Sequence, residues 1–422
     1  MGNACFGEHH KSGHNNTVNI KHFDIERVIG KGGFGKVNCV VKRKGDDKGM
    51  RYAMKTIWKS EAFRSKSTED MLFNELKILN TVNHPQLVNM LYAFQDDFRC
   101  YLILDLALGG DLEYQRQQQP LGCFDEGASL FYVSQLFVAL EYMHSLNILH
   151  RDIKPDNLVL EANGYIKLTD FGISKYMDER RRCSARSGTG IYMAPEITQS
   201  CAVNGKEETS HGVAADFYAM GITLYFFLTG ELPMQSKRRG SSMGMEETKQ
   251  DMEQETTQSI IQARINDMGK NDRVSDACKD FVLKLTDPHE RVRLMLESKV
   301  CTDTYPSDDG AHDRIRLHPW FEHVDWAQLA QHTLTPPLLP DTKRANCNTG
   351  HDDASDTFLG TGEEELILPV LDEAQQKRLL TYDYNTGATG EHQPEEPAAA
   401  STDLSPGSVS GNKYKSAKVA PL

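Results

Sequence analysis

The strongest constraint on this chain is one short string, HRDIKPDN, at residues 150–157. Packing in a core does not explain charged and amide side chains inside an otherwise apolar stretch. Each polar type has a chemical use: Asp152 can orient a hydroxyl and accept its proton, and Lys154 can offset charge on a phosphoryl group. Asn157 can offer an amide oxygen to a hard cation. The string therefore predicts a loop built for phosphoryl transfer.

Two further motifs follow this string. Asp170 lies thirteen residues after Asn157, within D-F-G at 170–172, and it comes directly after the strand-like run IKLT. Its carboxylate supplies a second oxygen ligand for Mg²⁺. The motif A-P-E at 194–196 closes the segment. Asp170 and Asn157 are therefore the candidate metal ligands.

A glycine-rich run precedes these motifs. Residues 30–37 read GKGGFGKV between two strand-like segments, whereas a dinucleotide-binding glycine motif would run into a helix. A plain hairpin explains such a run about as well. A loop of this kind can also lay backbone N–H groups over phosphates, and Phe34 at its tip can exclude water. The phosphate-binding candidates are Gly30, Lys31, Gly32, Gly33, Phe34 and Gly35.

A lysine on the next strand has two candidate partners. Lys55 ends the run YAMK, which is the slot of the V-A-I-K motif, and Glu75 follows twenty residues later. A strand lysine and a helix carboxylate are ordinarily solvated. Glu75 adjoins the apolar face of the helix predicted over 67–82, and it is favoured over Glu69 as the partner of Lys55.

The periodicity of the chain predicts a small sheet domain before a larger helical one. Strands are predicted over 23–30, 35–43 and 51–59 as an antiparallel meander, then a helix over 67–82 and strands over 87–95 and 100–108. After Gly109-Gly110 the pattern turns helical, beginning with 127–146. The apolar stretch around 218–228 is too short to cross a membrane and predicts a buried core helix.

Composition excludes several classes of protein. The net charge of −13 argues against a nucleic-acid binder, which needs a concentrated basic surface. The nine cysteines form no C-x-x-C pair, so a zinc site or a disulfide framework is not expected. No apolar segment of the kind that directs secretion opens the chain. A reducing, cytoplasmic location is expected.

Taken together, these motifs resemble the eukaryotic protein kinases over residues 22–323. The resemblance implies an α+β, bilobed fold, with a small antiparallel-sheet N-lobe that carries one helix and a larger, mostly helical C-lobe. It implies ATP in the cleft between the lobes, with Mg²⁺, or Mn²⁺ as an alternative. By the same resemblance, Leu104 is the gatekeeper, Asp105 to Ala107 form the hinge, and Asp111 lies near the ribose, while Val37, Ala53 and Val159 enclose the adenine.

The resemblance also implies contacts that support the site. Glu196 is expected to pair with Arg291, and Asp216 is expected to brace the catalytic loop. Lys154 and Thr189 match the serine/threonine pattern, so protein serine or threonine hydroxyls are the expected acceptors. The alternative is a catalytically weak pseudokinase scaffold, which requires a lost Lys, Asp or Asn that is present here.

Within the family, the chain looks most like the YANK subfamily of the AGC group. The similarity rests on FDIERVIGKGGFGKV, on ALEYMHSLNILHRDIKPDN and on the region after the catalytic domain, HVDWAQLAQHTLTPPLLPDTKRANC. Phe226 departs from the pattern, because many arginine-directed AGC kinases have an acidic residue there. We therefore expect a preference for one basic residue near a hydrophobic one, and not for two arginines.

The expected organisation has five parts. Met1-Gly2-Asn3-Ala4-Cys5 can take a myristoyl group on Gly2 and a palmitoyl group on Cys5, which would attach a monomeric kinase to membranes peripherally. The parts are a flexible arm with a candidate lipid anchor (1–21), the N-lobe (22–104), the C-lobe with polar insertions at 236–258 and 299–313 (105–323), an AGC-like extension (324–385) and a disordered tail (386–422).

Overall fold

The structure is a computed structural model, and the residues that it describes lie between 18 and 385. Gly2, Cys5, Gly33, Phe34, the insertion predicted at 236–258 and the tail from 386 lie outside the described residues. The described residues are 18–32, 35–184, 186–198, 201–203, 206–208, 210–233, 263, 273–295, 310–342, 371, 373–379, 382 and 384–385.

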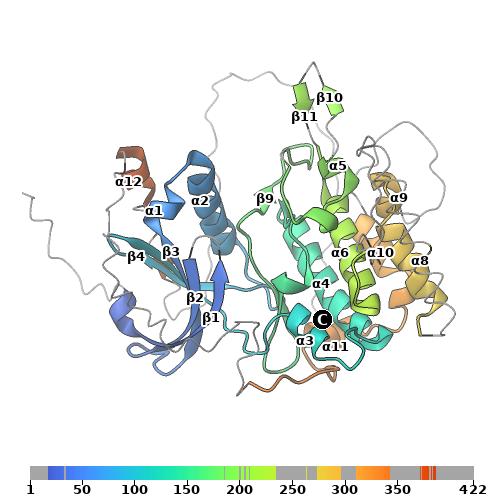
Figure 1. Cartoon of the computed structure of the whole chain (residues 1–422), viewed down its shortest axis with the longest axis horizontal. Helices are drawn as coiled ribbons and strands as arrows, with labels where there is room; N and C mark the ends of the chain where they lie inside the picture. Colours follow the sequence, from blue (N-terminus) through green and yellow to red (C-terminus); the bar gives the residue numbers. More distant parts are fainter. Residues whose placement is uncertain are drawn as a thin grey trace, which may run out of the picture. The chain divides into compact units, whose positions relative to one another are not determined.

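The N-lobe is built on a twisted antiparallel sheet (Figure 1). Strands β1 (Phe23–Gly32), β2 (Gly35–Lys42) and β3 (Arg51–Trp58) form the predicted meander, and the full order is β1-β2-β3-β5-β4-β12. Strand β4 (Met90–Gln95) begins later than predicted, and β5 (Arg99–Leu104) ends earlier. Beyond Leu104, one backbone bond still joins the two segments, from the Asp105 N–H to the Asn89 carbonyl at 3.0 Å.

Helix α2 (Lys66–Thr81) packs beside this sheet. It begins and ends one residue earlier than predicted. Ser65 and Thr68 cap each other's backbone N–H groups, which sets the first turn. Leu72, Leu76 and Leu79 are buried, as their spacing predicts. A short helix of four residues, α1 (Lys59–Ala62), follows β3 in addition to the expected helix.

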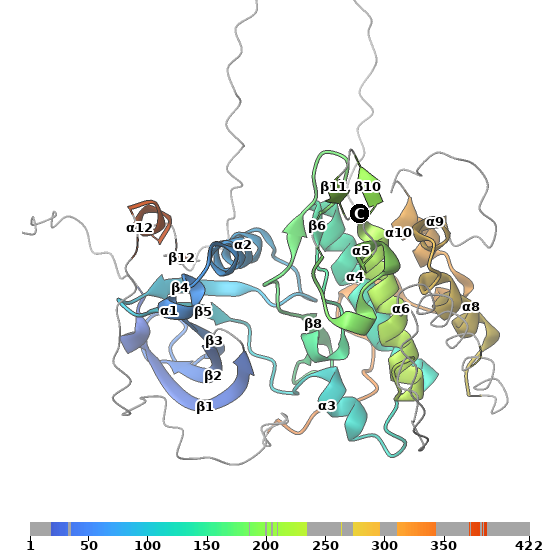
Figure 2. The same cartoon turned by 45° about the horizontal axis from the view of Figure 1, so that its top comes forward.

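The C-lobe is mostly helical, and α6 (Val213–Thr229) runs through its core beside α4 (Glu126–Ser145) (Figure 2). Every residue of α6 from Val213 to Leu228 is buried, so the prediction of a core helix near 218–228 is confirmed. Within the described part of the chain, no helix combines the length and apolar character that crossing a membrane requires. The other helices are α3 (Leu112–Gln117), α5 (Pro195–Thr198), α8 (Asp276–Leu285), α9 (Glu290–Met295), α10 (Ala311–Arg316) and α11 (Trp326–Ala330).

Short strand pairs hold the two polar motifs in place. Strand β6 (Ile148–Leu149) pairs with β9 (Lys175–Tyr176), and β7 (Leu158–Leu160) pairs with β8 (Ile166–Leu168). The HRDIKPDN loop therefore runs between β6 and β7, and the D-F-G segment follows β8. A further hairpin joins β10 (Cys201–Val203) to β11 (Lys206–Glu208).

One part of the C-terminal half differs from the expected organisation. The polar insertion predicted at 299–313 extends too far toward the C-terminus. Ala311 is fully buried and is the first residue of helix α10. Helix α12 (Glu373–Leu379) and strand β12 (Tyr384–Asn385) lie on the N-lobe, where β12 pairs with β4. Gln95 Nε2 donates to the Leu379 carbonyl at 2.6 Å, and Arg378 pairs with Glu69 of α2.

Candidate active site

The HRDIKPDN loop is anchored from below by one buried carboxylate, Asp216 on α6. It accepts hydrogen bonds from the backbone N–H groups of His150 at 3.0 Å and Arg151 at 2.8 Å, and it bonds His144 Nε2 at 2.8 Å. Burial raises the pKa of Asp216, but the bond and charge of His144 outweigh it and hold the pKa below its ordinary value. A fixed anion therefore sets the path of the loop.

Asp152 is the centre of a hydrogen-bond cluster at the loop's mouth. Its Oδ2 atom accepts hydrogen bonds from Lys154 Nζ at 2.7 Å and from Asn157 Nδ2 at 2.9 Å. Its Oδ1 atom accepts from Thr189 Oγ1 at 2.5 Å. Burial alone would raise the pKa of Asp152, yet these donors lower it below its ordinary value. Asp152 is thus an ionised acceptor with a fixed orientation.

Asn157 and Asp170 lie beside this cluster. The bonds of Asn157 to Asp152 use its amide N–H group, so its amide oxygen is not consumed by them. Asp170 has a left-handed backbone with φ of 66°, and its Oδ1 accepts from the Gly172 N–H at 3.4 Å. A strained residue of this kind is typical of functional sites. The two oxygen donors suit a hard divalent cation.

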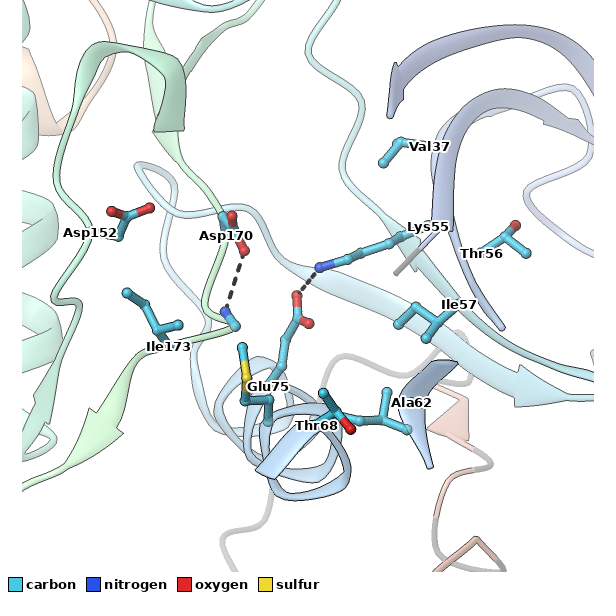
Figure 3. A pocket seen from close by; sticks show the side chains of 14 residues that line it. Val37, Lys55, Thr56, Ile57, Ala62, Thr68, Glu75, Asp152, Asp170 and Ile173 are labelled. Atoms are coloured by element: carbon cyan, nitrogen blue, oxygen red, sulfur yellow. Dashed lines mark hydrogen bonds and ion pairs between the residues drawn. The ribbon is translucent and has the colours of Figure 1, made fainter. Parts of the chain in front are cut away.

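Lys55 and Glu75 form the ion pair expected between β3 and α2. Lys55 Nζ lies 2.6 Å from Glu75 Oε1, and Figure 3 shows the pair facing Asp170 across the pocket. Burial lowers the pKa of Lys55, but the charges of Glu75 and Asp170 outweigh it and raise the pKa above its ordinary value. The alternative partner, Glu69, bonds Lys66 and Arg378 instead.

A pocket joins these groups from both lobes (Figure 3). From the sequence candidates it collects Gly35, Val37, Lys55, Glu75, Asp152 and Asp170. It extends toward α1 and α2 along side chains that the motifs do not mark, namely Ile57, Ala62, Thr68, Met71 and Leu72. No motif marks these side chains, so sequence reasoning missed them.

The glycine loop supplies the roof of this pocket. Glycine is required at Gly35, because a Cβ there would lie 1.7 Å from the Thr56 carbonyl oxygen. In the β1–β2 hairpin, Gly30 pairs with Val37, Lys31 with Lys36 and Gly32 with Gly35. The two strands are thus pinned on each side of the tip, in the strand–turn–strand form that the sequence indicated.

The remaining nucleotide candidates lie outside this pocket's lining, and the structure pairs four of them. Ala53 pairs with Leu104 in the sheet, and Asp111 bridges Val159. Asp111 also caps α3 through the Tyr114 N–H at 2.7 Å.

The hinge is held by polar contacts. Asp105 accepts from Asn89 Nδ2 at 2.8 Å and lies 3.1 Å from Lys167 Nζ, and Ala107 follows two residues later. Lys167 and Asn89 carry no motif, so sequence reasoning missed them.

The expected partner of Glu196 was wrong by two residues. The guanidinium of Arg293, and not that of Arg291, pairs with Glu196. Arg293 is fully buried and also donates to the Ala214 carbonyl at 3.1 Å, whereas Arg291 lies on a half-exposed part of α9. The orientation of the helix turns the second arginine inward.

The model of the protein kinase domain matches residues 23–305. The chain belongs to this family. Serine/threonine-protein kinase 32B of Homo sapiens is 34% identical over 342 residues, which cover 79% of this chain and 72% of that protein. Ribosomal protein S6 kinase alpha-2 of Homo sapiens is 34% identical over 328 residues, 76% of this chain and 39% of that protein.

These relatives confirm the prediction of a serine/threonine protein kinase domain with a bilobed α+β fold. The chain spans less than half the length of the S6 kinase relative and about seven tenths of the other. The family uses ATP and a divalent metal, and its acceptors are proteins.

Proposed function

We propose that this kinase domain is catalytically active and transfers the γ-phosphoryl group of ATP to serine or threonine hydroxyls of proteins. The observation that carries the proposal is the cluster at Asp152, with Lys154, Thr189 and Asn157 bonded to one carboxylate. A pseudokinase scaffold has no need of such a cluster, and it is the less favoured alternative.

The roles follow from position and charge. Asp152 orients the acceptor hydroxyl and accepts its proton, since its carboxylate is ionised and fixed. Lys154 lies where it offsets negative charge on the transferred group, and Lys55, held by Glu75, binds phosphate oxygens. Charge stabilisation of this kind supplies most of the acceleration in phosphoryl transfer.

Asn157 and Asp170 are the proposed metal ligands. Two protein oxygens leave most of the coordination sphere to phosphates and water, which is the pattern of Mg²⁺ at nucleotide sites, and Mn²⁺ accepts the same donors. The bound metal would neutralise phosphate charge.

The proposed nucleotide site continues from this pocket to the hinge. Gly30 to Gly35 cover the phosphates with backbone N–H groups, and Phe34 excludes water. Leu104, Asp105 and Ala107 flank the base, and Asp111 faces the ribose. Val37, Ala53 and Val159 enclose the adenine. The register that joins Ala53 to Leu104 and the bridge from Asp111 to Val159 support this placement.

Within the family, we assign the chain to the YANK subfamily of the AGC group, with the five-part organisation given above. It acts as a cytoplasmic monomer on protein substrates, without nucleic acid. Lipidation at Gly2 and Cys5 attaches it peripherally to membranes. Both acyl groups are needed, because one acyl chain alone binds a membrane only marginally.

The deciding experiment is a Mg-ATP incubation with radiolabelled γ-phosphate and a protein substrate. Wild type transfers label and Asp152→Asn does not, while both unfold at similar temperatures. Equal incorporation by the two proteins would overturn the proposal.

For the membrane assignment, Gly2→Ala should move the protein from the membrane pellet to the supernatant, and an unmodified N-terminus by mass spectrometry would exclude lipidation.

A further inference from the structure

Helix α3 contacts residues Pro155–Asn157 of the catalytic loop, and α6 contacts the turn Gly190–Tyr192, so charged side chains on these helices lie near the acceptor side of Asp152. Tyr192 follows Thr189, the residue bonded to Asp152, in the turn Gly190–Tyr192. Burial raises the pKa of Tyr192. The charges of Asp156 and Glu113 raise it further, and Arg116 opposes them. The charges of Asp156, Glu113 and Arg116 therefore reach the turn that follows Thr189.

Arg116 on α3 is held on three sides. Its Nη2 and Nε atoms donate to the two carboxylate oxygens of Glu113 at 2.7 and 2.8 Å, in the bidentate geometry that arginine favours. Its guanidinium carbon lies 4.3 Å from the ring centroid of Phe226 on α6. Its Nη1 atom also donates to the Gly122 carbonyl.

This arrangement occupies two surfaces that attract cationic side chains. The Glu113 carboxylate accepts two hydrogen bonds from Arg116 and one from Gln117, and Arg116 covers the face of Phe226 that attracts cations. The side chain of Arg116 is only 9% exposed, so it is fixed in this position by its contacts.

Two other carboxylates nearby, those of Asp111 and Asp156, lie in each other's electrostatic field. Burial raises the pKa of Asp111, and the charge of Asp156 raises it further, which is the mark of two acids in each other's field. Asp156 is exposed. A cation between the two acids relieves their repulsion, so this pair remains able to attract one basic side chain.

We propose that Arg116 is a specificity-determining residue: it fills the place of a substrate's second basic side chain, so that substrates of this kinase carry a single one. The inference rests on the proposed kinase activity. It identifies the group of this chain that sets the preference, and it implies that removing this group creates a preference for two basic residues.

The test uses the full chain and synthetic peptides that contain one serine and one arginine at its best position. A second arginine is then placed at each other position before the serine, and kcat/KM is measured for every peptide. For wild type, the second arginine should change kcat/KM by less than about twofold at every position. For Arg116→Met, it should raise kcat/KM about tenfold at one position, since Glu113 is released.

Two further variants separate this role from packing. Arg116→Lys keeps a cation beside Glu113 and should retain the wild-type preference. Arg116→Met combined with Glu113→Gln should lose the gain, because no carboxylate has been released. Lys279→Met removes a cation from a surface ion pair on α8 and serves as the matched control.

The outcomes are distinguishable. If no peptide is phosphorylated, the proposed kinase activity fails. If single-arginine peptides are phosphorylated but Arg116→Met gains nothing from a second arginine at any position, the assignment of Arg116 is wrong. Should Arg116→Met not fold, Glu113→Gln in the wild-type background leaves the arginine uncompensated. It should then favour peptides with an acidic residue, and an unchanged preference would overturn the proposal.

Discussion

Replacing Asp216 by asparagine tests how strongly the buried anion under the catalytic loop matters. Asparagine has nearly the same shape, but only one of its two polar atoms accepts hydrogen bonds. The carboxylate of Asp216 accepts from two backbone N–H groups and from His144, and it is 1% exposed. In the variant at least one buried N–H group meets an NH₂ group instead of an acceptor.

The expected loss follows from these bonds. An unsatisfied buried donor costs about 1–3 kcal/mol, and the remaining bonds lose the benefit of a charged acceptor, so the total is about 3–5 kcal/mol. At about 2 °C per kcal/mol for a domain of this size, Tm should fall by roughly 6–10 °C. Because His150 and Arg151 shift with the loop, kcat should fall by about a hundredfold.

The dependence on pH checks the cause. The pKa of Asp216 in the folded chain lies below its ordinary value of 3.8, so its stabilising effect is present above that value and is lost as pH falls through the folded pKa. The difference in unfolding free energy between wild type and variant should be constant above about pH 5 and should narrow below 3.8.

Thermal unfolding and steady-state kinetics measure both quantities, with Asp276→Asn as the control. The side chain of Asp276 is 99% exposed, and its loss should change stability by no more than about 0.5 kcal/mol. A folded Asp216→Asn protein with the Tm and kcat of wild type would refute the reasoning.

Three other predictions address the remaining groups. Asp170→Asn should lower kcat at saturating Mg-ATP about a hundredfold or more with little change in Tm, and substantial retained turnover would argue against Asp170 as a metal ligand. Ser184→Ala and phosphatase treatment should leave most activity, since alanine occupies position 185, the usual acceptor slot of the activation loop; loss of activity in both would contradict this. Arg293→Ala should destabilise the fold by about 3–5 kcal/mol, because Glu196 is left without its buried partner, whereas Arg291→Ala should cost far less. Urea unfolding compares the two arginine variants, and equal losses would count against the pairing.

The local elements of the fold could be predicted because their signals are local. Helix α2 shows apolar residues at helical spacing and a cap formed by Ser65 and Thr68, and the prediction was one residue from the observed bounds. Helix α1 has four residues and no side-chain cap, so neither periodicity nor a start signal marks it. The pairing of β12 with β4 joins residues far apart in sequence, which no local pattern encodes.

The site shows the same division. Motif spacing was sufficient to select Lys55, Glu75, Asp152 and Asp170 as site residues. All four line one pocket. The choice between Arg291 and Arg293 depends on the orientation of the helix, since side chains two residues apart on a helix point in directions that differ by about 200° around its axis.

Arg116 shows what such reasoning cannot reach. The spacing of Glu113 and Arg116 is that of an ordinary surface pair on a helix. Its contact with Phe226 depends on how α3 packs against α6, which the spacing does not encode.

The pairing of β12 with β4 has a practical consequence for shortened forms of this protein. The sheet ends at β4 when the last strand is absent, because β12 is the outer member of the order. A chain cut after the kinase motifs, near residue 323, would leave the edge of β4 at Tyr92 and Ala93, where β12 pairs, open to another molecule. Such a chain should self-associate at concentrations where the full chain does not, and light scattering of the two lengths side by side would show it.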